Sequence, residues 1–434
     1  MTDEMIVTAA PAEQAARVAA SRRLLPRSTS SIAAAQLTGQ GLAVVTSVLL
    51  ARRLGVAGFG VYAFVVALVF VANVGTTFGT DMVVIREVAA DRRLDRCAAA
   101  LGVQLALSAA AIIAMFAVSA VVPDRAAQYV APVRIFSLSL LPAAWFSVGT
   151  ALLRGLLLLR TYATLVVAAA AVPLGAVATF VHRGDSLSRA MTVMLLAQVA
   201  LGVAAAACCA APLRAAHAMR WPSRDDVVAM AHASRAIGGL GMVGVLYQRL
   251  AMLGVSVFAG PAATGLYSSA ARVVEASKTG HVALGAATFP LMAEAENRPG
   301  DAELTGVLRR SWMVCIGLAA AASLVLVVAG PTVVEHLYGH AYRRAEHAVV
   351  LLAVGIVPST LATFLSLAML AKHREREVLW VLALAVVVLA VALAVLVPAL
   401  GLIGACWAML AADTVQAVGL ALRLRRPASQ GGAS

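Results

Sequence analysis

Apolar stretches long enough to cross a lipid bilayer occupy most of this chain and constrain its fold more than any other feature. The hydrocarbon core of a bilayer is about 30 Å thick, and an α-helix needs about 20 apolar residues to span it. Counting the apolar runs that are bounded by charged residues, glycine or proline predicts twelve such helices. They lie near residues 31–54, 58–80, 97–121, 131–153, 161–181, 190–212, 236–258, 264–291, 308–330, 347–370, 378–397 and 401–422.

The composition agrees with a membrane protein. Hydrophobic residues make up 62% of the 434 residues and charged residues 13%, whereas soluble domains average about 45–50% and about 25%. We therefore predict an all-α integral membrane protein. A net charge of +13 would suggest a nucleic-acid partner in a soluble protein. Here we assign most of the arginine to membrane topology, so we expect no nucleic acid as partner.

The distribution of Lys and Arg along the chain predicts the topology. With the N-terminus inside, the inner segments carry 23 of the 34 Lys and Arg residues and the outer loops carry 8. Positively charged residues are concentrated on the cytoplasmic side of membrane spans. The asymmetry therefore supports twelve spans with both termini cytoplasmic. Residues 1–30 lack the apolar segment of a signal peptide and are expected to form a cytoplasmic tail.

An internal repeat divides the chain into halves. Residues 55–62 recur as residues 260–267, an offset of 205, and residues 141–160 resemble residues 357–376, an offset of 216. Chance similarity between apolar stretches rich in glycine and alanine is the alternative, and two matches at similar offsets favour a true repeat. Six spans per half give both halves the same orientation. We predict two lobes related by a parallel pseudo-two-fold axis, with a central cavity between them.

The repeat and the charged interruptions predict five segments. The longest polar interruption joins the two lobes and is expected to lie at the inner leaflet. The segments are a cytoplasmic tail (1–30), an N-terminal six-helix lobe (31–212), a cytoplasmic linker (213–235), a C-terminal six-helix lobe (236–423) and a second cytoplasmic tail (424–434).

Four ionisable residues lie inside the two spans that open the second half: Arg249, Arg272, Glu275 and Lys278. At this depth a charged side chain costs at least about 2.5 kcal/mol, so such groups face a bundle interior or a watery cavity. At 1.5 Å per residue, Arg272 lies about 12 Å from the outer turn and Arg249 about 18 Å from the inner face. In a core of about 30 Å these are similar depths. We predict a cationic cavity lining.

Two roles for these charges stay open. Glu275 can pair with Arg272 or Lys278 merely to hold helices together. Alternatively, the positive side chains meet an anionic group in transit while Glu275 orients them. Arginine suits the second role because its planar guanidinium binds phosphate bidentately, whereas lysine acts as a point charge.

The first half has far fewer charges at the matching depth. Its polar side chains are predicted to line the substrate cavity, with Gln36, Gln40 and Asn73 as the substrate-binding candidates. The predicted polar lining is Gln36, Thr38, Gln40, Thr46, Ser47, Asn73, Thr76 and Thr77. Gln36 and Gln40 are four residues apart and share one helix face. Hydrogen bonding between packed helices is the alternative role for these side chains.

Three charged residues lie at the predicted inner mouth of the first half: Asp81, Arg86 and Glu87. They are candidates for a gate ion pair. A solvated pair at the membrane interface is the alternative, because exposed ion pairs contribute little free energy.

No pattern in the sequence indicates catalysis. The chain lacks a nucleophile elbow, a phosphate-binding loop and a metal-binding helix motif. We therefore predict no enzyme activity, no catalytic residues, no metal and no cofactor. Without an ATP-binding motif, transport would be driven by a coupling ion, H⁺ or Na⁺, or by downhill flow.

Several loose motifs, taken in order, resemble the Wzx-type polysaccharide flippases of the multidrug/oligosaccharidyl-lipid/polysaccharide exporter superfamily. The motifs are residues 50–62, 86–89, 289–292, 337–342, 370–374 and 397–405. Arg249 lies where the second-half family pattern has a basic position. Arg272 and Lys278 are carried over only as charges of the cavity.

The resemblance implies two six-helix lobes and translocation of a polyprenyl-diphosphate-linked oligosaccharide from the inner to the outer leaflet by alternating access. The implied setting is a bacterial cytoplasmic membrane and synthesis of a surface glycan such as O-antigen or exopolysaccharide. Membrane lipids and other polysaccharide-assembly membrane proteins are the implied partners. The alternatives are a cation-coupled small-molecule exporter, a lipid II flippase and, as an enzyme, a glycan polymerase or ligase. The last needs a sizeable outer loop, which this chain lacks.

Overall fold

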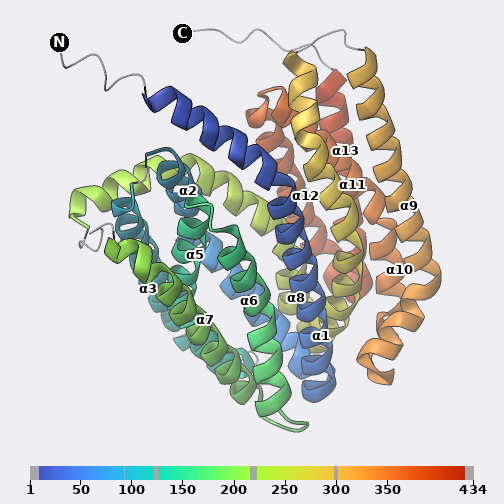
Figure 1. Cartoon of the computed structure of the whole chain (residues 1–434). Helices are drawn as coiled ribbons and strands as arrows, with labels where there is room; N and C mark the ends of the chain where they lie inside the picture. The colour runs from blue at the N-terminus through green and yellow to red at the C-terminus, as the bar shows by residue number, and fades with distance from the viewer. Residues whose placement is uncertain (1–8, 92, 122–126, 216–221, 298–301, 426–434) are drawn as a thin grey trace, which may run out of the picture.

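The computed structural model describes residues 9–91, 93–121, 127–215, 222–297 and 302–425, and every regular element within these ranges is a helix (Figure 1). The helices are α1 (Ala9–Thr77), α2 (Thr80–Asp91), α3 (Asp95–Ala120), α4 (Ala127–Ser137), α5 (Leu140–Gly155), α6 (Leu159–Phe180), α7 (Leu187–Ala215), α8 (Arg224–Asn297), α9 (Ala302–Tyr338), the 3₁₀-helix η2 (His340–Ala345), α10 (Glu346–Val354), α11 (Ile356–Ala371), α12 (Glu375–Leu400) and α13 (Leu402–Arg425).

The predicted number of spans is confirmed. Nine helical stretches of the described chain are long and apolar enough to cross a membrane, and counting the bent pair α4 and α5 as one broken span gives ten. Two of the nine stretches, in α1 and α8, each consist of two helices joined at Gly55 and Gly260, which brings the total to twelve. The φ angles of these glycines are 71° and 79°, a left-handed conformation that glycine adopts without steric penalty.

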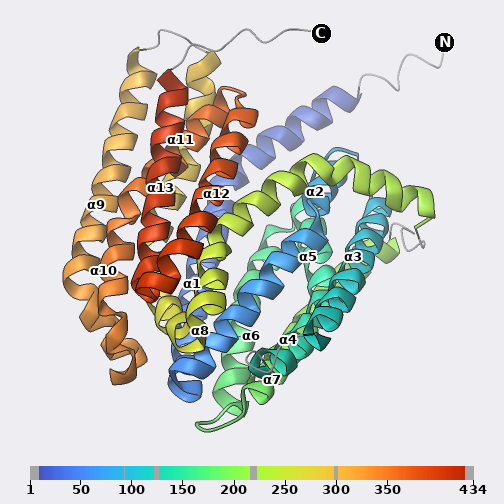
Figure 2. The ribbon, with the colours of Figure 1, turned by 180° about the vertical axis from the view of Figure 1, so that it is seen from behind.

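The helices form two groups that face each other across the middle of the molecule (Figure 1 and Figure 2). Helices α2 to α7 lie in one group and α9 to α13 in the other, while the hairpins α1 and α8 lie where the groups meet. This is the predicted architecture of two six-helix lobes. Helix α8 begins at Arg224, inside the segment predicted to link the lobes, and the lobe boundaries themselves remain predictions.

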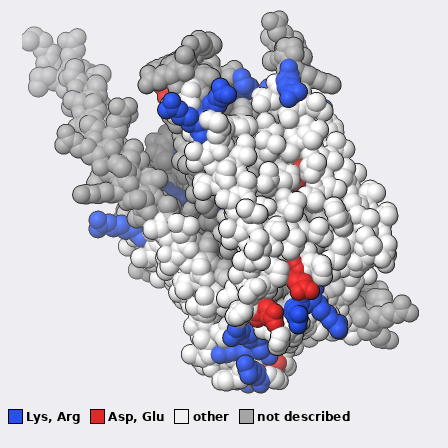
Figure 3. All heavy atoms as spheres, turned by 90° about the vertical axis from the view of Figure 1, so that its right-hand side faces the viewer, with Lys and Arg blue, Asp and Glu red and all other residues white. Residues whose placement is uncertain are grey.

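We call the end of the bundle where α1 begins and α13 ends the termini side, and the opposite end the far side (Figure 1). In Figure 3, Lys and Arg gather near both ends, and the surface between them is largely uncharged. A largely uncharged belt is what a surface in contact with hydrocarbon requires, because charged side chains at the bilayer centre are costly.

The repeat is visible as a reciprocal contact between the lobes. Gly60 and Gly265 occupy equivalent positions of the repeat, and each lies against the backbone of the opposite hairpin. A Cβ atom on Gly60 would lie 1.8 Å from the carbonyl oxygen of Pro261, and one on Gly265 would lie 2.1 Å from that of Val56. Only glycine permits this approach. The two hairpins therefore touch backbone to backbone at equivalent points, as a pseudo-two-fold axis requires.

Further bonds join the lobes toward the far side. The Arg52 guanidinium donates to the carbonyl oxygens of Leu337 at 2.7 Å and His336 at 2.5 Å, at the end of α9. The Tyr342 hydroxyl donates to the Ala51 carbonyl at 3.1 Å. These bonds attach the hairpin turn of α1, at Gly55, to the second lobe. The two lobes are therefore in contact on the far side.

Candidate functional site

A cavity of about 230 Å³ lies between the lobes. Its walls come from both limbs of α1 and both limbs of α8, so each lobe supplies part of the lining. The lining residues are Ser47, Phe59, Tyr62, Ala63, Val66, Ala67, Phe70, Arg249, Met252, Ser268 and Arg272. We call this space the central cavity. The first lobe contributes mainly apolar and aromatic side chains, and the second lobe contributes both charges.

The structure brings Arg249, Arg272 and Glu275 together. The carboxylate of Glu275 lies 3.7 Å from Nη1 of Arg249 and 3.6 Å from Nη1 of Arg272. The Arg249 side chain is 18% exposed and that of Glu275 is 47% exposed. The helical geometry explains the arrangement: the two limbs of α8 run antiparallel and place the arginines at similar depths, and Glu275 follows Arg272 by one turn. The three groups carry a net charge of +1.

The first lobe contacts the same cluster through an aromatic ring. The guanidinium carbon of Arg249 lies 4.8 Å from the centroid of the Phe70 ring, a distance typical of a cation–π interaction. Phe70 is the repeat equivalent of Glu275, at the offset of 205. The repeat offset is therefore the sequence signal that points to Phe70, which charge-based reasoning alone misses. Arg249 is held by a carboxylate from its own lobe and by a ring from the other.

Lys278 points into a different space. It lines a second cavity of about 70 Å³ inside the C-terminal lobe, together with Glu275, Gln248 and Asp413. Its ammonium group donates to the Ser359 hydroxyl at 2.9 Å. Three-residue steps on a helix turn the side chain by about 300°, so Arg272 and Lys278 point about 120° apart. The central cavity is therefore lined by two of the three predicted cations.

The second cavity also holds a buried acid. Asp413 on α13 is 3% exposed and accepts a hydrogen bond of 2.6 Å from the Tyr247 hydroxyl on α8. Tyr247 and Arg249 are two residues apart, which places their side chains on opposite sides of the helix. One limb of α8 thus presents Arg249 to the central cavity and Tyr247 to the interior of the C-terminal lobe.

Of the polar residues predicted from the first half, Ser47 lines the central cavity, whereas Gln36, Gln40 and Asn73 do not. Gln36 and Gln40 are exposed on the termini-side half of the first limb of α1. Asn73 is half-buried, and its Oδ1 has no hydrogen-bond partner within the described ranges. The spacing of the glutamines predicts that they share one face of the helix, but it does not predict which helix or cavity that face contacts.

The residues predicted to form a gate lie on α2. Asp81 pairs with Arg154 at 3.7 Å and Glu87 with Arg96 at 2.9 Å, and both pairs lie within the first lobe. Arg86 is exposed. A gate role for these residues remains a prediction.

The fold and the inter-lobe cavity define a class: an all-helical membrane protein with two six-helix lobes around a central cavity. Comparisons identify the family. The protein-family model described as "Polysaccharide biosynthesis protein" matches residues 25–296, and the chain belongs to this family. In sequence, no curated protein matches the chain.

Solved structures share the fold. A multidrug resistance MATE-family transporter of the MOP superfamily in its inward-facing conformation superposes with a TM-score of 0.72 at 16% identity, over 90% of this chain and 94% of that one. The outward-facing conformation gives 0.64 at 17% identity, over 92% and 95%. The lipid II flippase MurJ in an inward closed conformation gives 0.72 at 11% identity, over 91% and 87%. The family and these structures are transporters and flippases, not enzymes.

Proposed function

We propose that this protein translocates a polyprenyl-diphosphate-linked oligosaccharide across the cytoplasmic membrane of a bacterium for cell-surface polysaccharide synthesis. The observation that carries the proposal is the pair Arg249 and Arg272, which meet at one inter-lobe cavity from the two limbs of α8. The family description, a polysaccharide biosynthesis protein, supports a glycan-linked substrate.

The chemistry of the cavity suits a diphosphate. A group with this much charge does not cross about 30 Å of hydrocarbon unaided, because burial of an unpaired charge is strongly unfavourable. Two guanidinium groups offset that desolvation with charge-assisted, bidentate hydrogen bonds. The rings of Phe59, Tyr62 and Phe70 provide apolar walls beside them. The polyprenyl chain stays in the lipid, outside the lobes.

Alternating access would proceed by movement of the lobes about the central cavity. The Gly60–Gly265 contact and the bonds from Arg52 to the end of α9 close the far side. We place the termini side in the cytoplasm, so this state is open to the inner leaflet. The higher TM-score with the inward-facing than with the outward-facing MATE structure agrees with that assignment. Release to the outer leaflet requires the far-side contacts to separate.

A small-molecule exporter is the second candidate, favoured by the MATE structures that share the fold. An exporter of cationic drugs needs acidic groups in its cavity, whereas the net charge around this one is positive. A lipid II flippase is the third candidate, because lipid II is also a diphosphate-linked saccharide and the MurJ structure shares the fold.

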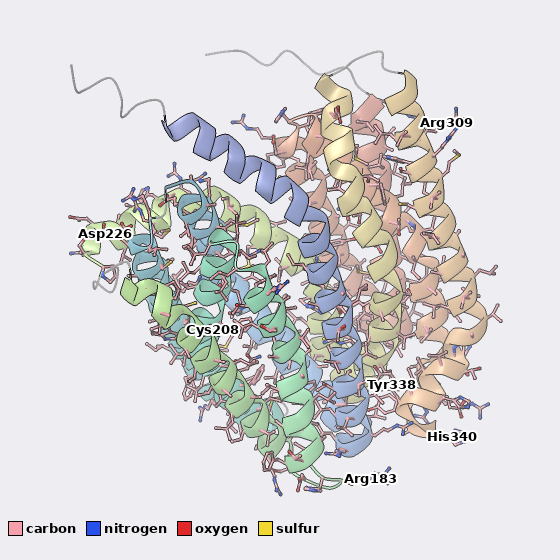
Figure 4. All side chains as sticks on the ribbon, viewed as in Figure 1. Arg183, Cys208, Asp226, Arg309, Tyr338 and His340 are labelled. Atoms are coloured by element: carbon pink, nitrogen blue, oxygen red, sulfur yellow. The ribbon has the colours of Figure 1, made fainter. Side chains whose placement is uncertain are left out.

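The test is a leaflet assay on inverted membrane vesicles from a deletion strain, with and without the full-length protein. It follows lipid-linked oligosaccharide from the outer face of the vesicle to its lumen. We expect transport that depends on the protein and is lost in Arg249→Ala and Arg272→Ala. The matched control is Arg309→Ala, an exposed arginine at the termini-side end of α9, labelled in Figure 4. Absence of protein-dependent transport, with altered drug sensitivity of the deletion strain, would instead favour the exporter. Transport of lipid II alone would favour the third candidate.

A further inference from the structure

Glu275 lies between the two cavities. Its carboxylate contacts Arg249 and Arg272, which line the central cavity, and its side chain also lines the second cavity with Lys278 and Asp413. On α8 it lies three residues after Arg272 and three before Lys278, so its side chain points about 60° from each. A change of side-chain rotamer is enough to move its carboxylate from one cation toward the other.

The present pairing of Glu275 is loose. Its distances to the two arginines, 3.7 and 3.6 Å, are longer than the 2.7–2.9 Å of a charge-assisted hydrogen bond. The side chain is also 47% exposed, and ion pairs that water reaches contribute little. A diphosphate carries more charge and can bind both guanidinium groups bidentately. It therefore competes successfully with this carboxylate for the arginines.

Lys278 offers Glu275 an alternative partner. Within the described residues, the Lys278 ammonium bonds to the neutral hydroxyl of Ser359 and lies within 4.0 Å of no carboxylate. The other acid of the second cavity, Asp413, already accepts the hydrogen bond of Tyr247. Side chains three residues apart on a helix are neighbours and form ion pairs. Lys278 is thus placed to receive the Glu275 carboxylate.

We propose that Glu275 is a displaceable counter-ion: it pairs with Arg249 and Arg272 while the central cavity is empty and passes to Lys278 when a diphosphate binds. This inference rests on the proposed function and assigns Glu275 a role in specificity. An anion must out-compete a built-in carboxylate for the arginines, which selects a diphosphate over an anion of lower charge. As the substrate leaves, Glu275 returns to the arginines, which favours release and lowers the net charge of the arginine cluster from +2 to +1.

The test is a double-mutant cycle on the purified full-length protein in detergent, with farnesyl diphosphate and farnesyl monophosphate as probes and dissociation constants measured by calorimetry at fixed ionic strength. Glu275→Gln should bind the diphosphate about tenfold more tightly and discriminate less against the monophosphate. Lys278→Met should bind it several-fold more weakly, because the displaced carboxylate has no partner. The double variant should bind like Glu275→Gln alone. Asp225→Asn, which removes an exposed negative charge from the first turn of α8, is the control and should bind like the wild type.

The outcomes separate this inference from the proposed function. If Arg249→Ala and Arg272→Ala bind farnesyl diphosphate normally, the proposed function fails. If these variants lose binding while Glu275→Gln binds like the wild type, only the counter-ion inference fails. If the effects of Glu275→Gln and Lys278→Met on the binding free energy of farnesyl diphosphate simply add, the Glu275 carboxylate does not pass to Lys278. Glu275→Ala should show the same sign as Glu275→Gln and provides a second variant if the first does not purify as a folded protein.

Discussion

The two lobes share a backbone plan but differ in chemistry at equivalent positions. Gly60 and Gly265 keep the same role in both, as the paired points where the hairpins touch. Yet the repeat equivalent of Arg272 is Ala67, and both residues line the central cavity. The symmetric positions serve the packing of the lobes and the asymmetric ones serve the cavity. Substitutions can therefore disturb the movement of the lobes and the binding of the substrate separately.

The largest expected effect comes from removing either of the two arginines that only the second lobe contributes to the central cavity. Arg249→Ala or Arg272→Ala should abolish transport in the vesicle assay, because each leaves the diphosphate with half of its cationic partners in a desolvated site. Membrane insertion and the thermal unfolding temperature should change little, since each arginine loses a loose ion pair and Arg249 also loses the Phe70 ring contact, worth about 0.5–1 kcal/mol. Normal transport by both variants would show that the arginines of the C-terminal lobe do not bind the diphosphate of the substrate.

The next effect comes from disturbing the symmetric contact. Gly60→Ala and Gly265→Ala place a Cβ about 2 Å from a backbone carbonyl of the opposite lobe, which forces the hairpins apart. Overpacking of this kind costs about 1–3 kcal/mol, and transport should fall about tenfold or more because the far side no longer closes. Binding of farnesyl diphosphate in detergent should be largely retained.

The matched control for this contact is Gly317→Ala. An added Cβ at Gly317, on α9, meets no atom within 4 Å, so this variant should transport normally. Thiol labelling of a cysteine introduced at Ala63, a residue lining the central cavity, reports far-side opening in a background without native cysteines. Unchanged labelling from the far side in the Gly60 and Gly265 variants would contradict the closure assigned to them.

A smaller effect is expected inside the C-terminal lobe. Tyr247→Phe removes the hydrogen bond to the buried Asp413 and leaves that carboxyl group without a hydrogen-bond donor among the described residues, which costs about 1–3 kcal/mol. The unfolding temperature should fall, while affinity for farnesyl diphosphate changes little because Tyr247 faces away from the central cavity. Tyr247→His, which keeps a donor on a ring, should restore part of the stability. An unchanged unfolding temperature in Tyr247→Phe would contradict a structural role for this bond.

These contrasts also show what the sequence could predict. The twelve spans follow from the lengths of the apolar runs, and the meeting of Arg249 and Arg272 follows from the rise per residue and the glycine turns. The sequence also predicts Lys278 beside them, but six residues of helix rotate its side chain by about 120° from Arg272, into another cavity. Gln36 and Gln40 share a face, as their spacing predicts, but that face does not line the cavity. Depth along a helix is encoded locally, whereas the neighbour that a face meets depends on the packing of the whole bundle.

The smallest expected effect concerns Arg249, whose guanidinium group is contacted by a side chain from each lobe. Phe70 and Glu275 are repeat equivalents, and both contact Arg249, one with a ring and the other with a carboxylate. Phe70→Leu keeps an apolar side chain but removes the ring face, which should cost about 0.5–1 kcal/mol. The dissociation constant for farnesyl diphosphate should rise about two- to fivefold, by the same magnitude. Phe70→Tyr keeps the ring and should bind like the wild type. If Phe70→Leu also binds like the wild type, Arg249 is positioned by its own lobe alone, and the first lobe contributes shape rather than attraction.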